Sequence, residues 1–276
     1  MARVGFIGAG SIGEPMVERL LAAGHRVRLY SRRAEVRDRL SGAGAELVGK
    51  PGEIAAADVV ISCLYQDSQV LEVLPEVVRA MPAGGVLISH TTGTPATLSR
   101  LDAFSLTGKA TIVDGAFSGT AEAVRAGRLV VYLGGEPEPV AVARSVVAAY
   151  AGPIILTGAR GSAMRVKLLN NLLFAAISQL TLRGLEAGRA LGVEEETLLE
   201  ALAVSSGGST AAEYIAARGG PDRYVSRVVP YLRKDLAAAR DAAAEAGIDL
   251  SALLTAAQEG PMNLGEDSLH ENGVVR

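Results

Sequence analysis

The chain has 276 residues, 49% of them hydrophobic, which is enough apolar material for one large domain or two moderate ones. A formal net charge of -3 and an aromatic content of 4%, with no Trp, argue against nucleic acid as a partner, because there is neither a basic excess nor a surface for base stacking. The single cysteine, Cys63, excludes an intramolecular disulfide, and three scattered histidines (His25, His90 and His270) give no ligand spacing for a metal ion.

The first residues of the chain do not resemble a secretory signal, so we expect none. MARVGFIGAG enters a strand directly, without a basic n-region and an apolar core. The longest uncharged apolar stretch is too short and too rich in amides to span a bilayer. We therefore expect a cytoplasmic protein with no membrane segment.

The first predicted element is a strand over residues 4–7, followed by the turn Gly8-Ala9-Gly10-Ser11-Ile12-Gly13 and a helix that runs to about residue 23. This is G-x-G-x-x-G between a strand and a helix, the context that a dinucleotide fingerprint requires. Gly8 makes the tight turn, Gly10 lets a pyrophosphate approach the backbone, and Gly13 lets the helix pack closely on the strand. The turn therefore predicts a dinucleotide site, with the anion at the start of the helix.

The second predicted strand, residues 25–30, ends in Ser31-Arg32-Arg33. An NAD-specific site usually carries an acid here for the ribose 2′-hydroxyl, but no acid occurs before Glu35. Two guanidinium groups and a hydroxyl suit a 2′-phosphate, so the sequence predicts a preference for NADP(H) over NAD(H). The alternative is a solvated basic turn.

Strands and helices continue to alternate over about 150 residues. The strands are expected at 57–64, 85–89, 111–113, 129–133 and 154–156, with helices at 66–80 and 95–104. This alternation predicts a doubly wound parallel sheet of the Rossmann type, with ligands at the carboxyl ends of its strands. Those ends are Leu64 and Tyr65, residues 90–92 with Thr92, and residues 114–120.

One long helix is predicted from Ser162, as its N-cap, to residue 191. It carries Lys167 at the edge of an uncharged stretch, residues 168–182, which we expect to be buried nearly all round. A lysine there is unfavourable unless it is paired or functional, and Asn171 lies on the same face at i+4. The alternative is a lysine that snorkels to solvent and an asparagine that satisfies a neighbouring carbonyl.

After residue 160 the strand pattern stops, and further helices are predicted at 194–203, 209–217, 229–246 and 250–258. The prediction is therefore a cofactor-binding domain, residues 1–160, joined through the long helix to an all-helical domain for substrate binding and dimerisation, residues 161–276. A domain of about 110 residues cannot easily bury that much apolar surface alone, so we expect a homodimer or a dimer of dimers.

Four segments resemble the β-hydroxyacid dehydrogenase family, which includes 3-hydroxyisobutyrate dehydrogenase, tartronate semialdehyde reductase and the glyoxylate or succinic semialdehyde reductases. Residues 4–16 (VGFIGAGSIGEPM) are similar to G-F-I-G-x-G-x-M-G-x-P-M, and residues 114–120 (DGAFSGT) to D-A-P-V-S-G-G. Residues 158–171 are similar to G-x-x-G-x-G-x-x-x-K-x-x-N-N, and residues 234–236 to K-D-L. The resemblance extends over nearly the whole chain and implies hydride transfer between NAD(P) and a small 3-hydroxy acid or semialdehyde.

Carried across by position, the resemblance makes Lys167 the catalytic residue and Asn171 its companion in orienting the substrate. An ammonium beside a carbonyl supplies both a proton and electrostatic stabilisation to the developing alkoxide. In the reverse direction, a neutral Lys167 takes the hydroxyl proton, which requires a pKa well below the usual value of about 10.4.

The same resemblance assigns the remaining site residues. Residues 118–120 (Ser118, Gly119 and Thr120) would hold the substrate carboxylate. Thr92 would lie near the nicotinamide ribose, and Lys234 would approach the cofactor from the helical domain. The partner is thus a small molecule.

The chain also departs from the family pattern. Gly115 and Ala116 replace Ala-Pro, the larger Phe117 and Thr120 change the wall of the substrate site, and Ala163 replaces a glycine. These changes leave the substrate open.

Imine reductases share the architecture but often carry Asp or Tyr at the position of Lys167, so the lysine argues against them. Phosphogluconate dehydrogenases usually show a histidine where this chain has Asn170, and their chains are much longer. The other alternative is a dinucleotide-binding sensor without turnover. Retention of Lys167, Asn171, Ser118 and Lys234 argues against a pure binder.

Overall fold

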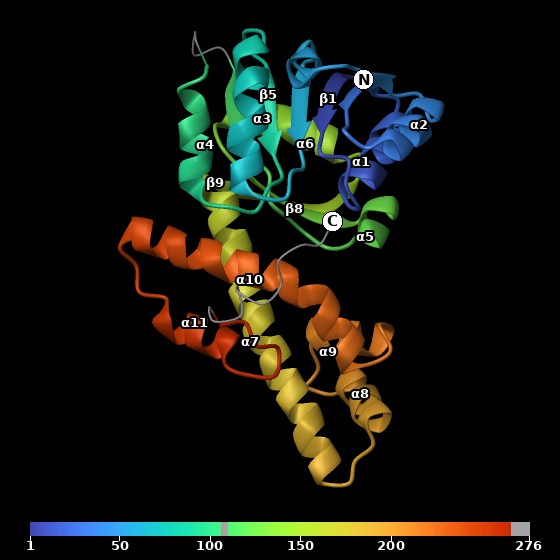
Figure 1. The fold of residues 1–276 in the computed structure, drawn as a ribbon, viewed down its shortest axis with the longest axis vertical. Helices are drawn as coiled ribbons and strands as arrows, with labels where there is room; N and C mark the ends of the chain where they lie inside the picture. Colours follow the sequence, from blue (N-terminus) through green and yellow to red (C-terminus); the bar gives the residue numbers. More distant parts are fainter. Residues whose placement is uncertain (106–109, 266–276) are drawn as a thin grey trace. The chain divides into compact units, whose positions relative to one another are not determined.

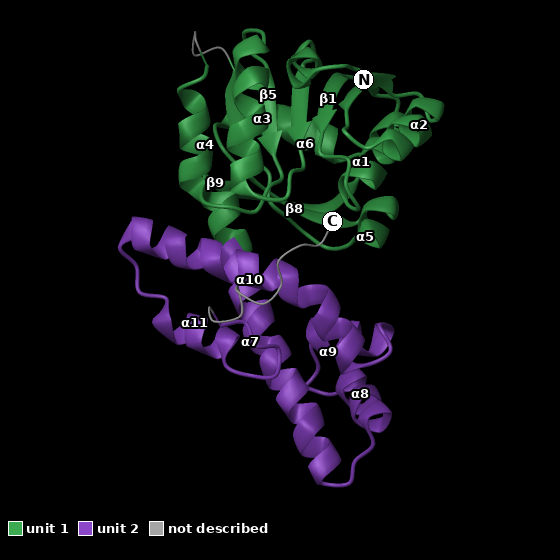
Figure 2. Ribbon diagram, in the orientation of Figure 1, with its two compact units in different colours: residues 1–167 green, residues 168–276 purple. Residues whose placement is uncertain are grey.

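The computed structural model describes residues 1–105 and 110–265, and it divides the chain into two compact units, residues 1–167 and residues 168–276 (Figures 1 and 2). The boundary expected from the sequence falls seven residues earlier, just before the long helix α7 (Ser162–Ala190) begins. His270, which entered the metal prediction, lies outside the described residues. Among the residues that are described, no helix has the length and apolar character needed to cross a membrane.

Unit 1 is built on a single sheet. Within the described residues its strands are β1 (Arg3–Ile7), β2 (Arg26–Tyr30), β3 (Glu46–Leu47), β4 (Val59–Ser62), β5 (Val86–Ser89), β6 (Thr111–Asp114), β7 (Phe117–Ser118), β8 (Leu129–Gly134) and β9 (Ala151–Gly158). Their order is β3-β2-β1-β4-β5-β6-β8-β7, with β9 paired to β8. All pairs from β3 to β6 are parallel, as the alternation of strands and helices predicts.

Of the strands after Asp114, β8 and β9 run opposite to the parallel strands, whereas β7 keeps their direction. β8 is antiparallel to both β6 and β7, while β9 is parallel to β8. A parallel neighbour requires a crossover of a dozen or more residues, usually helical, but the connection after β7 contains only the five-residue helix α5 (Ala121–Arg125). The short connection turns the chain back, so the predicted parallel sheet continues at this edge into antiparallel pairs, which the sequence pattern did not indicate.

Helices cover both faces of the parallel part of the sheet (Figure 1). One face packs against α1 (Gly13–Ala22), α2 (Ala34–Gly42) and α6 (Pro137–Val147), and the other against η1 (Pro51–Ala55), α3 (Asp67–Ala80) and α4 (Pro95–Asp102). Successive strand residues alternate between these two cores: Ile61 and Ile88 face the first, whereas Val60 and Leu87 face the second. Both faces are therefore sealed by apolar side chains, as expected for a parallel sheet.

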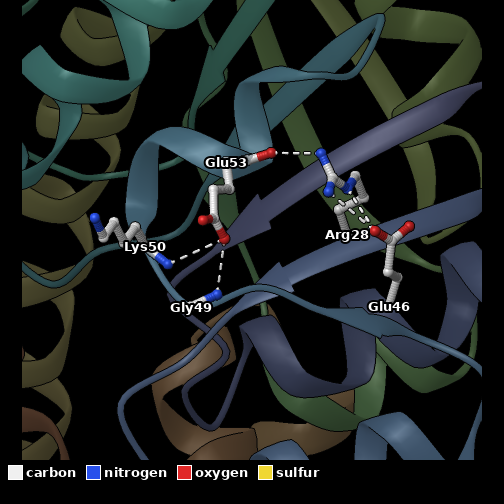
Figure 3. Close-up of polar contacts among 5 residues, drawn as sticks. All are labelled: Arg28, Glu46, Gly49, Lys50 and Glu53. Carbon is white, nitrogen blue, oxygen red and sulfur yellow. Dashed lines mark hydrogen bonds and ion pairs between the residues drawn. The ribbon is translucent and has the colours of Figure 1, made fainter.

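The outer strand β3 is held by a polar network with η1 (Figure 3). Arg28 of β2 donates from Nε to Glu46 Oε1 at 2.9 Å and from Nη1 to the backbone oxygen of Glu53 at 2.7 Å. The Glu53 carboxylate accepts in turn from the backbone nitrogens of Gly49, at 2.9 Å, and Lys50, at 3.3 Å. One arginine thus ties the short edge strand to the turn that leads into β4.

Unit 2 is helical throughout its described part. Besides most of α7 it contains α8 (Glu195–Val204), α9 (Thr210–Ala217), α10 (Pro221–Ala246) and α11 (Ser251–Gln258). α10 begins eight residues before the predicted start, because Pro221 occupies its first turn after Gly220 and Pro230 is accommodated inside the helix.

The expectation that residues 168–182 are buried nearly all round is wrong. Leu169, Leu173, Ile177 and Leu180 are 42%, 51%, 40% and 67% exposed, whereas Leu172 and Ala175 are fully buried. The exposed residues follow a spacing of four, four and three, which places them on one face of α7. We call these four residues the α7 stripe.

Candidate active site

The carboxyl ends of five parallel strands lie in one row. The pairing registers join Tyr30 to Ile7, Ile7 to Ser62, Ser62 to Ser89, and Ser89 to Asp114. The segments that follow these residues are the ones predicted to bind ligands: Ser31 to Arg33, Gly8 to Gly13, Leu64 and Tyr65, Thr92, and Ser118 to Thr120. The register therefore brings the starts of all these segments to the same edge of unit 1.

The glycine loop at the end of β1 depends on close backbone packing. Gly8 has φ +95°, and a Cβ there would collide with the carbonyl of Cys63. A Cβ at Gly13 would collide with the carbonyl of Gly8. Gly10 differs, because an added Cβ would meet no atom of the described chain within 4 Å. The fold itself therefore requires glycine at positions 8 and 13, whereas Gly10 leaves open space beside the backbone.

The start of α1 suits an anion. Its N-cap residue, Ile12, makes no side-chain cap hydrogen bond, so no side chain of the cap covers the backbone N–H groups of the first turn. The N–H of Glu14 already donates to the carbonyl of Gly10 at 2.9 Å and Pro15 has no N–H, so the N–H of Gly13 and the helix dipole are what favour a phosphate at this position. Together with the space beside Gly10, this arrangement fits the pyrophosphate of a dinucleotide. Ala9 is buried, whereas Ser11 is exposed.

The two arginines of the basic segment after β2 differ in their contacts. Arg33 donates from Nη2 to the backbone oxygen of Ala9 at 2.5 Å, and its backbone nitrogen donates to Ser31 Oγ at 3.3 Å. Arg32 and Arg33 are both exposed. Arg33 is therefore anchored to the glycine loop, a contact that the sequence did not indicate.

The loops after β4 and β5 are fixed by side chains of α3. Tyr65, which is 44% exposed, donates its backbone N–H to Gln69 Oε1 at 2.9 Å. Asp67 accepts from the backbone nitrogen of Thr94 at 2.8 Å, and a Cβ at Gly93 would collide with the same carboxylate. The half-buried Thr92 thus precedes a tightly held turn.

Asp114, the last residue of β6, connects the sheet to the first turn of α7. Its Oδ2 accepts from the backbone nitrogen of Met164 at 3.0 Å. Burial raises the pKa of the Asp114 carboxyl, and hydrogen bonds from backbone N–H groups, Met164 first, oppose this shift. A Cβ at Gly134 would lie 2.7 Å from Ser162 Oγ and would also collide with Asp114.

Met164 also contacts the loop after β5. Its sulfur accepts from the backbone nitrogen of Gly93 at 3.2 Å, next to Thr92. Ser162, predicted as the N-cap, is instead the first helical residue, and its hydroxyl lies 2.7 Å from Thr157 Oγ1. The carboxylate that accepts from Met164 at the start of α7 comes from Asp114, 50 positions earlier in the chain, so local sequence could not reveal it.

The predicted substrate segment forms part of a short strand and a turn. Ser118 is half-buried in β7, where it pairs with Val130 of β8. Gly119 has φ +133°, a conformation that favours glycine, and it is exposed. Thr120 Oγ1 accepts from the backbone nitrogen of Ala123 at 3.4 Å and caps α5. The segment is therefore held in place by its own turn.

Lys167 and Asn171 lie one turn apart on α7, and the structure gives the amide a partner that the sequence did not suggest. Lys167 is half-buried, whereas Asn171 is only 7% exposed. Asn171 Nδ2 donates to Asp235 Oδ2 of α10, and Asn171 Oδ1 accepts from Asn170 Nδ2 at 3.1 Å. Asp235 is the middle residue of the K-D-L segment, so the motif could have indicated it.

Lys234, which precedes Asp235 in the chain, binds the carboxylate of Asp235. Its Nζ lies 2.9 Å from Asp235 Oδ1, an ion pair without the directional geometry of a hydrogen bond. Asn171, Asp235 and Lys234 therefore form one polar cluster inside unit 2.

Comparison with known proteins agrees with this geometry. Residues 3–158 match the family model for the NAD binding domain of 6-phosphogluconate dehydrogenase, and residues 161–269 match the NAD-binding domain of NADP-dependent 3-hydroxyisobutyrate dehydrogenase. The chain belongs to the β-hydroxyacid dehydrogenase family. It is an oxidoreductase with an NAD(P)-binding Rossmann domain, and the predicted resemblance to this family is confirmed.

Three similar proteins are 24% to 30% identical to the chain over the aligned residues. The NAD-dependent L-serine dehydrogenase of Pseudomonas aeruginosa is 30% identical over 217 residues, which cover 77% of this chain and 73% of that protein. The mitochondrial 3-hydroxyisobutyrate dehydrogenase of Homo sapiens is 28% identical over 208 residues, 74% of this chain and 62% of that protein. A solved 3-hydroxyisobutyrate dehydrogenase of Mycobacterium tuberculosis has the same fold, with a TM-score of 0.81, 24% identity, and coverage of 94% and 92% of the two chains.

Proposed function

We propose that the protein is an NADP-dependent dehydrogenase that transfers a hydride between the nicotinamide and a small 3-hydroxy acid or the corresponding semialdehyde, with Lys167 as general acid and base. The proposal is carried by the two contacts of Met164. Its backbone N–H binds Asp114, where the substrate segment begins, and its sulfur binds the loop that contains Thr92. Lys167 follows Met164 by about one helical turn.

Lys167 supplies the proton chemistry in this mechanism. When bound, the nicotinamide donates or accepts the hydride at the reacting carbon. Lys167 donates a proton to the substrate oxygen as negative charge develops there, and its charge stabilises that oxygen beforehand. In the oxidation direction, neutral Lys167 takes the proton of the hydroxyl group. Asn171 orients the substrate, and the hydrogen bond to Asp235 fixes its amide.

The cofactor is held along the edge of the sheet. The loop Gly8 to Gly13 and the start of α1 would take the pyrophosphate, and Leu64, Tyr65 and Thr92 would bind the nicotinamide half, with Lys234 of α10 as a further proposed cofactor residue. Arg32 binds the 2′-phosphate together with Ser31, and Arg33 braces the loop through Ala9 while it adds positive charge. The missing acid after β2 supports NADP(H) over NAD(H).

Ser118, Gly119 and Thr120 bind the carboxylate of the substrate. The names of two relatives support this class, because 3-hydroxyisobutyrate and L-serine both combine a carboxylate with a hydroxyl group on the third carbon. Phe117 stands where the family pattern has a smaller residue, so we expect a preference for short substrates without a bulky branch.

The proposal is tested with a panel of small 3-hydroxy acids, semialdehydes and a cyclic imine, each assayed with NADPH or NADP+ and with NADH or NAD+ by the absorbance of the reduced nicotinamide. We expect turnover of at least one 3-hydroxy acid or semialdehyde. Reduction of the imine in preference to every semialdehyde would replace the proposal with an imine reductase. Tight NADPH binding without turnover of any compound would replace it with a dinucleotide sensor.

We also propose that the protein is a homodimer or a dimer of dimers, and that the α7 stripe is buried between two copies. Support comes from the four neighbouring apolar side chains that the described chain leaves exposed. In light scattering, Leu173→Glu should shift the protein toward the monomer. Val204→Glu, at an exposed position at the end of α8, is the matched control and should leave the assembly unchanged. A wild-type monomer at micromolar concentration would contradict the proposal.

A further inference from the structure

His90, which follows β5, makes two hydrogen bonds with its ring although it is only 1% exposed. Nδ1 bonds the backbone oxygen of Gly115, and Nε2 bonds the hydroxyl of Tyr150 at 2.7 Å. A carbonyl oxygen can only accept, so Nδ1 must carry the proton and Nε2 must accept from the Tyr150 hydroxyl. Burial lowers the pKa of His90 to about 4, so the ring is neutral near pH 7.

Gly115 and Phe117, two departures from the family pattern, both contact this histidine. A Cβ at Gly115 would lie 2.6 Å from Ile88 Cγ2 and 3.1 Å from His90 Nδ1, so alanine does not fit there while both neighbours keep their positions. The ring of Phe117 packs edge-on against the His90 ring, with centroids 5.9 Å apart. His90 therefore occupies the space behind the segment that leads to Ser118.

We propose that His90 is a positioning residue for the substrate segment: its Nδ1–H holds the carbonyl of Gly115, its ring supports Phe117, and Tyr150 fixes the proton on Nδ1. The direction of Ser118 and Gly119, three and four residues beyond the anchored carbonyl, then follows from the position of His90. The inference rests on the proposed function in one respect, which is that residues 118–120 bind the substrate carboxylate.

Three substitutions separate the contributions of the Nδ1–H donor and of the hydrogen bond to Tyr150. His90→Leu removes the donor, His90→Asn keeps an N–H donor near the position of Nδ1 but cannot reach Tyr150, and Tyr150→Phe removes only the hydroxyl. His25→Leu is the matched control, because His25 is a half-buried histidine whose Nδ1 contacts Ala2 instead, 3.3 Å from its nitrogen. Each variant is examined as full-length protein with NADP+ bound.

Two measurements are made on each variant: amide hydrogen exchange of the peptide that covers residues 115–120, and KM and kcat for the best substrate of the panel. His90→Leu should exchange at least tenfold faster in this peptide and raise KM about tenfold, while kcat changes less than threefold and NADP+ affinity stays unchanged. His90→Asn should stay within about threefold of wild type in both measurements. Tyr150→Phe should fall between them, and His25→Leu should match wild type.

Equal behaviour of His90→Leu and His90→Asn would overturn the inference, because the retained donor would then have no effect. Faster exchange with unchanged KM would overturn it as well, since the segment would be held without serving the substrate. If His90→Leu does not fold, unchanged exchange in Tyr150→Phe overturns the inference and faster exchange there supports it. A wild-type enzyme that turns over neither a 3-hydroxy acid nor a semialdehyde refutes the proposed function separately, while exchange in residues 115–120 still decides whether His90 holds the segment.

Discussion

The glycine loop, residues 8–13, and the helical segment of α7 from Met164 to Asn171 contribute to the candidate site in opposite ways. In the loop, two positions must lack a side chain, because a Cβ at Gly8 or Gly13 would collide with backbone carbonyls. In the α7 segment, the backbone is ordinary helix, and the proposed chemistry depends on the side chains of Lys167 and Asn171. The loop thus depends on the absence of side chains at two glycines, and the α7 segment depends on two polar side chains.

This difference separates binding from chemistry. Changes in the loop alter the fit of the backbone to the cofactor or to its neighbouring strand, so they should appear in affinity and folding. Changes in the α7 segment leave the cofactor platform intact, so they should appear in turnover. Substitutions at six positions test this separation.

Lys167→Ala should lower turnover at least about a hundredfold, the usual contribution of general acid–base catalysis, and should leave the NADPH dissociation constant nearly unchanged. Lys167→Arg should not restore activity, because a guanidinium keeps its proton near neutral pH. Single-turnover hydride transfer measures the effect. A near-native rate of hydride transfer in Lys167→Arg would mean that Lys167 has no proton-transfer role and only places its charged group in solvent.

Gly10→Ala and Gly13→Ala form a matched pair within the loop. Gly10 has open space around an added Cβ, so its substitution should change the free energy of unfolding by less than about 0.5 kcal/mol and weaken NADPH binding about tenfold or more. Gly13→Ala should instead destabilise the protein by about 1–3 kcal/mol, because the methyl group collides with Gly8. Urea unfolding measures the change in stability, and fluorescence titration measures NADPH affinity. Equal losses of stability in the two variants would contradict the predicted difference between Gly10 and Gly13.

Ser31→Asp should reverse the cofactor preference, since a carboxylate at the end of β2 repels the 2′-phosphate and accepts hydrogen bonds from a ribose hydroxyl. We expect a change of about tenfold in each direction in kcat/KM for NADPH and NADH. Turnover with saturating cofactor should stay the same. Wild-type protein that uses NADH as well as NADPH would show that residues 31–33 do not select the phosphate.

Asn171→Ala should have the smallest effect, about three- to tenfold, divided between kcat and KM, because an amide can orient a carbonyl but cannot supply its proton. Asp235→Asn keeps the shape but removes the charged acceptor of Asn171 Nδ2 and should reproduce part of the loss. Steady-state kinetics of both variants and of the double variant measures their coupling. Fully additive effects would show that the hydrogen bond between them does not act in the reaction.

Much of the fold can be predicted from the sequence because its signals are local. The alternation of apolar runs with amphipathic segments places β1, β4 and β5 within a few residues, and the spacing of three glycines identifies the turn into α1. Lys167 stands out since it interrupts the start of an apolar helix. Each of these features depends on neighbours within one or two turns of the chain.

The tertiary structure decides the rest, because the contacts involved join positions far apart in the sequence. The carboxylate of Asp114 at the start of α7, the hydrogen bond of Asn171 to Asp235, and the ring contacts of His90 with Gly115 and Tyr150 span 25 to 64 positions. Helical periodicity marks an apolar residue without saying whether its own chain covers it, so only the packed structure shows that the α7 stripe stays exposed. Local patterns therefore determined the elements and the main catalytic candidate, and packing determined which polar groups hold each other in place.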